Sequence, residues 1–198
     1  MSDTIQKYSK PAIILHWVIA IMILAMFGLG WYMTDLPKEA PKAATLDLFD
    51  LGVYTVQFTE AITPRAFYFN LHKSLGVTVF LLLLVRIFVR IKYTPPAYPT
   101  SMKDWEIKLA ALVHKGLYGL MAAVPLAGIV MTVYSKYGMK WFGLPLFSGL
   151  DNPGLRDIFK EAHEIIGLIL ITVIVLHVAS AIKHKVVDKD DVMKRMSL

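Results

Sequence analysis

Histidines are the side chains of this 198-residue chain with the clearest capacity to hold a metal or a cofactor: His16, His72, His114, His163, His177 and His184. The chain contains no cysteine, which excludes disulfides, thiolate-held iron–sulfur clusters and covalent haem attachment through a C-x-x-C-H motif. Several of the histidines lie within or beside long apolar segments. Placing an ionisable side chain within a bilayer costs free energy, so each of these histidines is a candidate functional residue.

The spacing of the histidines predicts two sites at different depths. His163 and His177 are 14 residues apart, which on a helix is about 21 Å along the axis and returns to roughly the same face. His16 lies six residues after Lys10 and His177 six before Lys183, so both belong near one membrane surface. His72 and His163 each open an apolar segment at the other surface. We therefore pair His16 with His177 and His72 with His163, an arrangement typical of b-type haem in a four-helix bundle.

Small residues one helical turn after four of the histidines support this pairing, because a flat porphyrin needs room beside its ligand. The small residues follow the four predicted ligands and are Ala20, Gly76, Gly167 and Ala181; the residues after His114 and His184 are Tyr118 and Asp188. Zinc is disfavoured, since two histidines per site are too few ligands for it. Two alternatives stay open: interhelical hydrogen bonding by the histidines, and a proton relay.

Other polar residues could complete these sites. Arg86 lies 14 residues after His72, at the depth of His16, and could bind a haem propionate or instead snorkel to head groups. Lys183 and His184 could bond or protonate a quinone, or only anchor the helix in head groups. His114 could serve a propionate or the quinone pocket. At the opposite surface, four basic residues could attract an anion or be ordinary loop charges: Arg65, Lys73, Arg156 and Lys160.

The elements that must position these residues are membrane helices. The chain is 56% hydrophobic and 18% charged, and Ala12–Met33, Gly116–Ser135 and Ile165–Ile182 carry no Asp, Glu, Lys or Arg. We predict an all-α integral membrane four-helix bundle, a single domain over residues 1–198, with helices at about 11–33, 67–91, 108–134 and 159–183. The first apolar run is too long for a cleaved signal peptide.

The distribution of basic residues predicts that both termini are cytoplasmic. Basic residues precede the first helix, join the second to the third and follow the fourth, as the positive-inside rule requires of the cytoplasmic side. Topology and head-group binding explain the net charge of +6 without a nucleic-acid partner. On the other side, the connection over residues 34–64 is long and acidic, and "TLDLFDLGVY" within it could form a short surface helix. Trp31 and Tyr32 suit an interfacial aromatic belt.

At this point the chain resembles the bacterial cytochrome b561 family of di-haem membrane proteins over nearly its whole length. The segments that carry the resemblance are "KYSKPAIILHW", "NLHKSLG", "RIFVRIKYTPP", "LVHKGLYGLMAAVPLAGIVM", "AHEIIG" and "LHVASAIKHKVVDKDDVMKRM". The resemblance implies two haem b groups with axial ligands His16, His72, His163 and His177. It also implies a multi-pass protein of the bacterial inner membrane, similar to superoxide oxidases that pass electrons from periplasmic superoxide to ubiquinone.

Three functions therefore remain open at the level of sequence. The first is a stand-alone superoxide:quinone oxidoreductase, or a carrier that takes electrons from another small periplasmic donor. The second is the membrane cytochrome subunit of a larger complex of the hydrogenase or formate dehydrogenase type. The third is a membrane protein without redox function, whose histidines only pack. The short basic tail after the fourth helix offers little docking surface, which favours the first.

Overall fold

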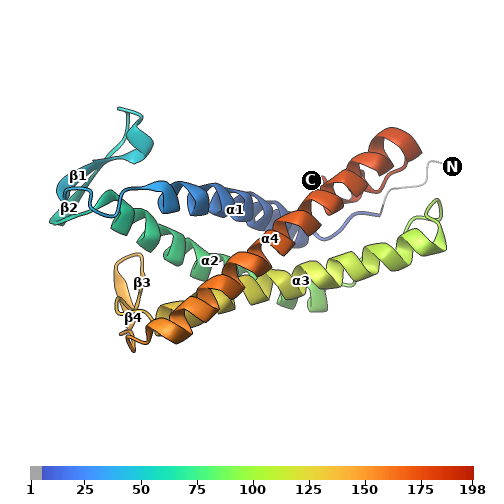
Figure 1. The fold of residues 1–198 in the computed structure, drawn as a ribbon. Helices are drawn as coiled ribbons and strands as arrows, with labels where there is room; N and C mark the ends of the chain where they lie inside the picture. Colours follow the sequence, from blue (N-terminus) through green and yellow to red (C-terminus); the bar gives the residue numbers. More distant parts are fainter. Residues whose placement is uncertain (1–5) are drawn as a thin grey trace.

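Four long helices build the structure, a computed structural model that describes residues 6–198 (Figure 1). They are α1 (Lys10–Asp35), α2 (Pro64–Lys92), α3 (Asp104–Val133) and α4 (Pro153–Lys183). The helix α1 lies beside α2, and α3 lies beside α4. The described part of the N-terminal segment and the C-terminus lie at one end of the bundle, called the terminal end below. The opposite end, with two β-hairpins, is called the hairpin end.

The surface of the bundle is suited to lipid. All four helices are long and apolar enough to cross a membrane. Large apolar side chains such as Ile21, Ile91 and Leu112 are exposed along their outer faces, and few residues of the helices are buried within the chain. The buried core between the helices is correspondingly small and centres on Ile19, Val79 and Leu170. The predicted four-helix membrane bundle is confirmed.

Local sequence signals explain where the helices begin. Three helices have proline in the first turn, where its missing N–H costs nothing. Thr63 caps α2 by accepting from the Ala66 N–H, and Asn152 caps α4 by accepting from the Leu155 N–H. The helix α3 begins at Asp104, four residues before the predicted start, because the Glu106 carboxylate accepts the Lys103 N–H at 3.0 Å.

At the terminal end the two ends of the chain close on each other. The helix α4 continues into a π-helical turn (η2, His184–Asp188), and a 3₁₀ turn follows (η3, Met193–Met196). Arg195 is buried, donates to the carbonyls of Gln6 and Ala97, and lies over the Tyr8 ring. The Tyr8 N–H in turn donates to the Arg195 carbonyl at 3.1 Å. A single guanidinium thus ties the tail to the N-terminal segment and to the connection between α2 and α3.

The hairpin end carries two antiparallel hairpins: β1 (Ala43–Asp47) with β2 (Thr55–Ile62), and β3 (Met139–Trp141) with β4 (Leu144–Phe147). The second hairpin is fixed to α2, where Ser74 Oγ accepts the Phe142 N–H at 2.9 Å and Trp141 donates to Thr78 Oγ1 at 3.2 Å. Ser74 and Thr78 are two and six residues after His72, so this hairpin is fixed to the part of α2 that carries this histidine.

The predicted short helix at "TLDLFDLGVY" is wrong. This segment forms strand β1, a three-residue 3₁₀ turn (η1, Leu48–Asp50) and the loop leading to β2. The reason is the following stretch, "TVQFTEAI", whose β-branched and aromatic residues pair with β1 from Asp47↔Thr55 to Ala43↔Ile62. Outside the membrane the fold is therefore not purely helical.

Replacement of Arg195 by alanine should loosen the terminal end. The Gln6 and Ala97 carbonyls would lose a buried charged donor, and we expect a loss of about 1–3 kcal/mol of stability. Thermal unfolding of the purified protein in detergent measures the loss, and trypsin cleavage of the tail should accelerate. Lys194→Ala is the matched control, because Lys194 is exposed and its ion pair with Asp191 lies on the surface. Equal stability of the two variants would contradict the role given to Arg195.

Candidate histidine sites in the membrane bundle

At the hairpin end, His72 of α2 faces His163 of α4, with their ring centroids 6.2 Å apart. His163 Nδ1 lies 2.8 Å from the Val124 carbonyl, and since a carbonyl only accepts, Nδ1 carries the proton. A side chain on Gly128 would come within 3.1 Å of the His163 ring, so the glycine lets this ring approach the α3 backbone. The Nε2 atom of His163 is thereby the nitrogen left for a ligand.

At the terminal end, His16 of α1 faces His177 of α4, with ring centroids 6.3 Å apart. The structure thus brings together both histidine pairs that the depth argument predicts. His114 of α3 also lies beside His177, with a centroid separation of 5.4 Å. Distance alone therefore leaves His16 and His114 as two possible partners of His177, and the choice of His16 rests on the small residue one turn beyond it.

The residues present fit a haem. A metal–imidazole nitrogen bond is about 2 Å, so two axial imidazoles on one iron have ring centroids about 6 Å apart. Both observed separations match this spacing. The buried Nδ1 atom of His72 has no hydrogen-bond partner within residues 6–198. A buried polar atom without a partner calls for an explanation, and a ligand group bound at this site is one. The donor set is all imidazole, which suits haem iron.

Arg86 lies at the terminal-end pair, at the depth predicted for it. Its Nη2 donates to His16 Nδ1 at 3.1 Å, and its Nε donates to the Tyr118 hydroxyl at 3.1 Å. The first contact places the proton of neutral His16 on Nε2, so it would have to break for Nε2 to bind iron. The third nitrogen, Nη1, is buried and has no partner among the residues that the structure describes. A carboxylate group of a bound ligand could accept a hydrogen bond from this unused guanidinium nitrogen beside the histidines.

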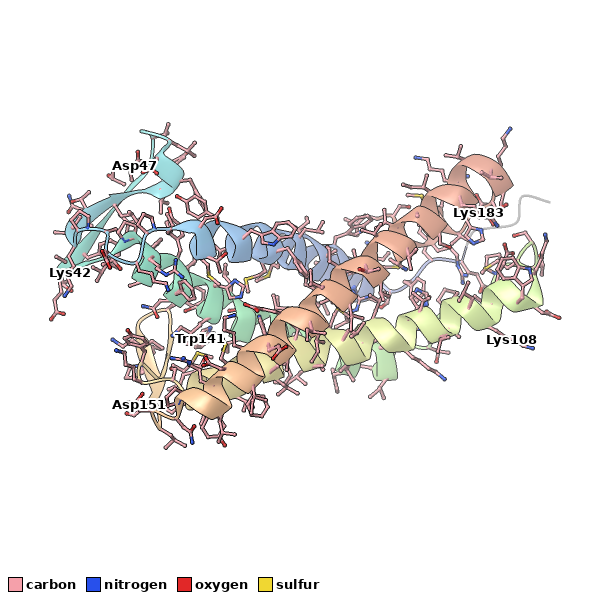
Figure 2. All side chains as sticks on the ribbon, in the orientation of Figure 1. Lys42, Asp47, Lys108, Trp141, Asp151 and Lys183 are labelled. Atoms are coloured by element: carbon pink, nitrogen blue, oxygen red, sulfur yellow. The ribbon has the colours of Figure 1, made fainter. Side chains whose placement is uncertain are left out.

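Lys183 and His184 lie in a cluster of carboxylates rather than at open head-group positions. The Lys183 ammonium is 2.6 Å from Glu106 and 2.8 Å from Asp188. His184 is buried, with Nδ1 2.7 Å from Asp190 and 3.1 Å from Asp188. The positions of Glu106, His184 and Asp188 could hold a metal ion by distance, but Lys183 already supplies the cation there. Both residues are thus paired with carboxylates at the terminal end, where Figure 2 labels Lys183.

The four basic residues considered at the hairpin end have different partners. Arg156 pairs with Asp157 at 2.8 Å and Lys160 with Glu164 at 2.7 Å, so a neighbouring acid offsets each charge. Arg65 donates to the carbonyls of Thr34 and Leu36. Lys73, next to His72, donates to the Gly138 carbonyl and pairs with no carboxylate among residues 6–198. Of the two that pair with no carboxylate among the described residues, Arg65 and Lys73, Lys73 is the one next to a paired histidine.

Sequence reasoning missed the residues that hold the histidines from neighbouring helices. A Cβ at Gly30 of α1 would lie 3.7 Å from His72 Cε1, and a Cβ at Gly128 of α3 would lie 3.1 Å from the His163 ring. Of the small residues predicted on the ligands' own helices, Gly76 lies next to Met26 and Gly167 next to Phe27. Glu106 was also missed, although the capping-box pattern at the start of α3 could have drawn attention to it.

Comparison with known proteins agrees with this architecture. The family model described as prokaryotic cytochrome b561 matches residues 7–197. Cytochrome b561 homologs 1 and 2 of Escherichia coli (strain K12) are 26% and 27% identical over 195 and 201 residues. These alignments cover 96% and 98% of this chain and 96% and 93% of those proteins. The probable superoxide oxidase CybB of Yersinia pestis is 27% identical over 195 residues, 96% of each chain. The chain therefore belongs to the prokaryotic cytochrome b561 family, membrane cytochromes that cross the bacterial inner membrane several times and carry haem b.

Proposed function

We propose that this protein transfers electrons from superoxide at the hairpin end to ubiquinone at the terminal end, with the hairpin end periplasmic. The observation that carries the proposal is the pair of two-histidine sites, His72 with His163 and His16 with His177, near opposite ends of one helix, α4. Two superoxide ions give up two electrons, and a quinone takes two electrons and two protons, so the stoichiometry balances. The name of the Yersinia pestis relative supports this donor.

Each histidine pair is proposed to hold one haem b. Haem b supplies the one-electron chemistry when bound, and the protein supplies ligation and electrostatics. The Val124 carbonyl accepts the hydrogen bond from His163 Nδ1 and so leaves the unprotonated Nε2 on the other side of the ring. The same hydrogen bond raises the basicity of Nε2. Arg86 is proposed to bind a propionate through its Nη1 atom, which has no other partner in residues 6–198.

At the terminal end, His184 and Lys183 are proposed to serve the quinone. The carboxylates of Asp188 and Asp190 hold His184 through Nδ1, which leaves Nε2 to face a quinone carbonyl. A histidine held by two carboxylates can take a proton from the cytoplasmic side and release it to the quinone. Lys183, bonded to Glu106 and Asp188, is proposed to keep this cluster in place. His114, beside His177, is proposed to line the same pocket.

At the hairpin end, Lys73 is proposed to attract superoxide. Its charge lies one residue from His72 and has no acidic partner within residues 6–198. An anion approaching a cation in a partly desolvated position is drawn in faster, by an amount that falls as salt is added.

The direct test supplies the isolated protein with superoxide and a soluble ubiquinone. We expect the visible band of reduced b-type haem to appear, ubiquinol to accumulate, and added superoxide dismutase to abolish both. Failure of both reactions unless a partner redox subunit is present would contradict the stand-alone enzyme and favour the membrane subunit of a larger complex. Absence of any haem band would contradict every redox function.

The haem content of histidine variants tests the ligand assignment. We expect His16→Ala and His72→Ala each to lower the haem-to-protein ratio from about two to about one, because a single imidazole holds the iron poorly. His114→Ala is the matched control beside His177 and should retain both haems. Haem is measured by its absorbance after extraction into alkaline pyridine. Loss of a haem in His114→Ala but not in His16→Ala would reverse the assignment.

Removal of the Lys73 charge tests the anion site. We expect Lys73→Gln to slow haem reduction by superoxide by about tenfold at low salt and to weaken its salt dependence. The rate is followed in a stopped-flow experiment. Lys160→Gln is the control, because Glu164 already compensates Lys160. An equal effect of the two substitutions would show that only the total charge matters.

A further inference from the structure

The turn of the first hairpin exposes a group of large apolar side chains: Phe49, Leu51, Val53 and Tyr54. Leu51, Val53 and Tyr54 are 63%, 69% and 66% exposed, and Phe49 is 46% exposed. Four such residues within six positions of an extramembrane loop form an apolar surface that water solvates poorly. None of them takes part in either histidine site.

The position of this turn is fixed at the level where the helices end. The ring of Phe49 packs at 5.2 Å from the rings of Tyr32 and Tyr68, and its N–H donates to the Tyr68 hydroxyl at 2.8 Å. Tyr32 lies near the end of α1, and Tyr68 is buried near the start of α2. The turn therefore lies beside the helix ends and does not project away from the bundle.

The direction of the hairpin agrees with these contacts. In Figure 2, Lys42, which precedes β1, lies at the far end of the molecule, whereas Asp47, which ends β1, lies back toward the bundle and to one side of it. The backbone reverses direction in this turn, where Phe49 and Asp50 have φ of 56° and 54°. The Asp47 carboxylate accepts the Gly52 N–H at 2.7 Å and closes the turn. In Figure 1 the turn between β1 and β2 thus lies off the end of α1 and to one side of the bundle.

The lipid-facing surface of α1 continues to the same level. Trp31, one residue before Tyr32, is 66% exposed, and Leu24 and Ile21, deeper along the helix, are 54% and 65% exposed. Tryptophan at this position marks the boundary between head groups and acyl chains. The apolar turn therefore lies at the interface that the transmembrane surface already defines.

We propose that the turn Phe49–Tyr54 inserts into the lipid interface of the leaflet on the hairpin side and anchors the first hairpin there. The occupant of this surface is the bilayer that the four helices cross. Asp50 limits the depth, since a carboxylate is tolerated among head groups and not in hydrocarbon. Leu51, Val53 and Tyr54 supply the apolar contact, and the anchored turn holds β1 and β2 against the membrane surface.

Site-directed spin labelling tests this directly, because the chain has no cysteine and one introduced thiol is unique. Val53→Cys is labelled with a nitroxide in vesicles of phosphatidylethanolamine and phosphatidylglycerol, and its collision rates with oxygen and with a neutral nickel complex are measured. Oxygen enriches in lipid and the nickel complex in water. We expect the ratio of the two rates to be several-fold higher at Val53 than at Lys42→Cys, an exposed position on the same hairpin.

The other outcomes each overturn the proposal. High access to both reagents at Val53 would show a turn in water. Low access to both would show a turn covered by protein, such as a second copy of the chain. Leu24→Cys on the lipid face of α1 gives the reference for a lipid-exposed label. Tyr54→Cys repeats the measurement if Val53→Cys lowers the helical circular dichroism signal. The result does not depend on superoxide or quinone chemistry.

Discussion

The structure depends on one constraint: a polar side chain within a bilayer must find its partner inside the protein. The four helices expose apolar residues to lipid and turn their histidines inward, where His72 meets His163 and His16 meets His177. The core between the two levels is small and apolar. Few side chains are buried between the helices. Polar contacts between helices, such as Arg86 with Tyr118 and His163 with the Val124 carbonyl, therefore contribute to how the helices pair.

Each end of the bundle meets the same constraint in a different way. At the terminal end, charged groups neutralise one another in the cluster of Glu106, Lys183 and the carboxylates around His184, and Arg195 binds backbone carbonyls. At the hairpin end, the Phe142 N–H and the Lys140 carbonyl of the second hairpin bind the Ser74 hydroxyl of α2. The spacing of the two histidine levels is set by α4 itself, which carries both His163 and His177.

The electrostatics of the two sites differ in a way that suits opposite tasks. Arg86 and the carboxylate-bound His184 place a fixed positive charge and a proton-carrying group near the terminal-end pair. Lys73 directly follows His72 of the other pair and lacks an acidic partner in residues 6–198. In the proposed function, this difference serves anion capture at one surface and proton-coupled chemistry at the other.

The sequence by itself determined the four membrane helices, the depth of each histidine and the level of Arg86, because hydrophobic runs and helical periodicity are local properties. It did not determine what faces each side chain across the bundle. The contact of Gly128 with His163, the capture of Lys183 by Glu106 and the pairing of β1 with β2 each join residues distant in sequence. Tertiary structure decided these contacts, since they depend on how helices and strands approach one another, and no local pattern records that.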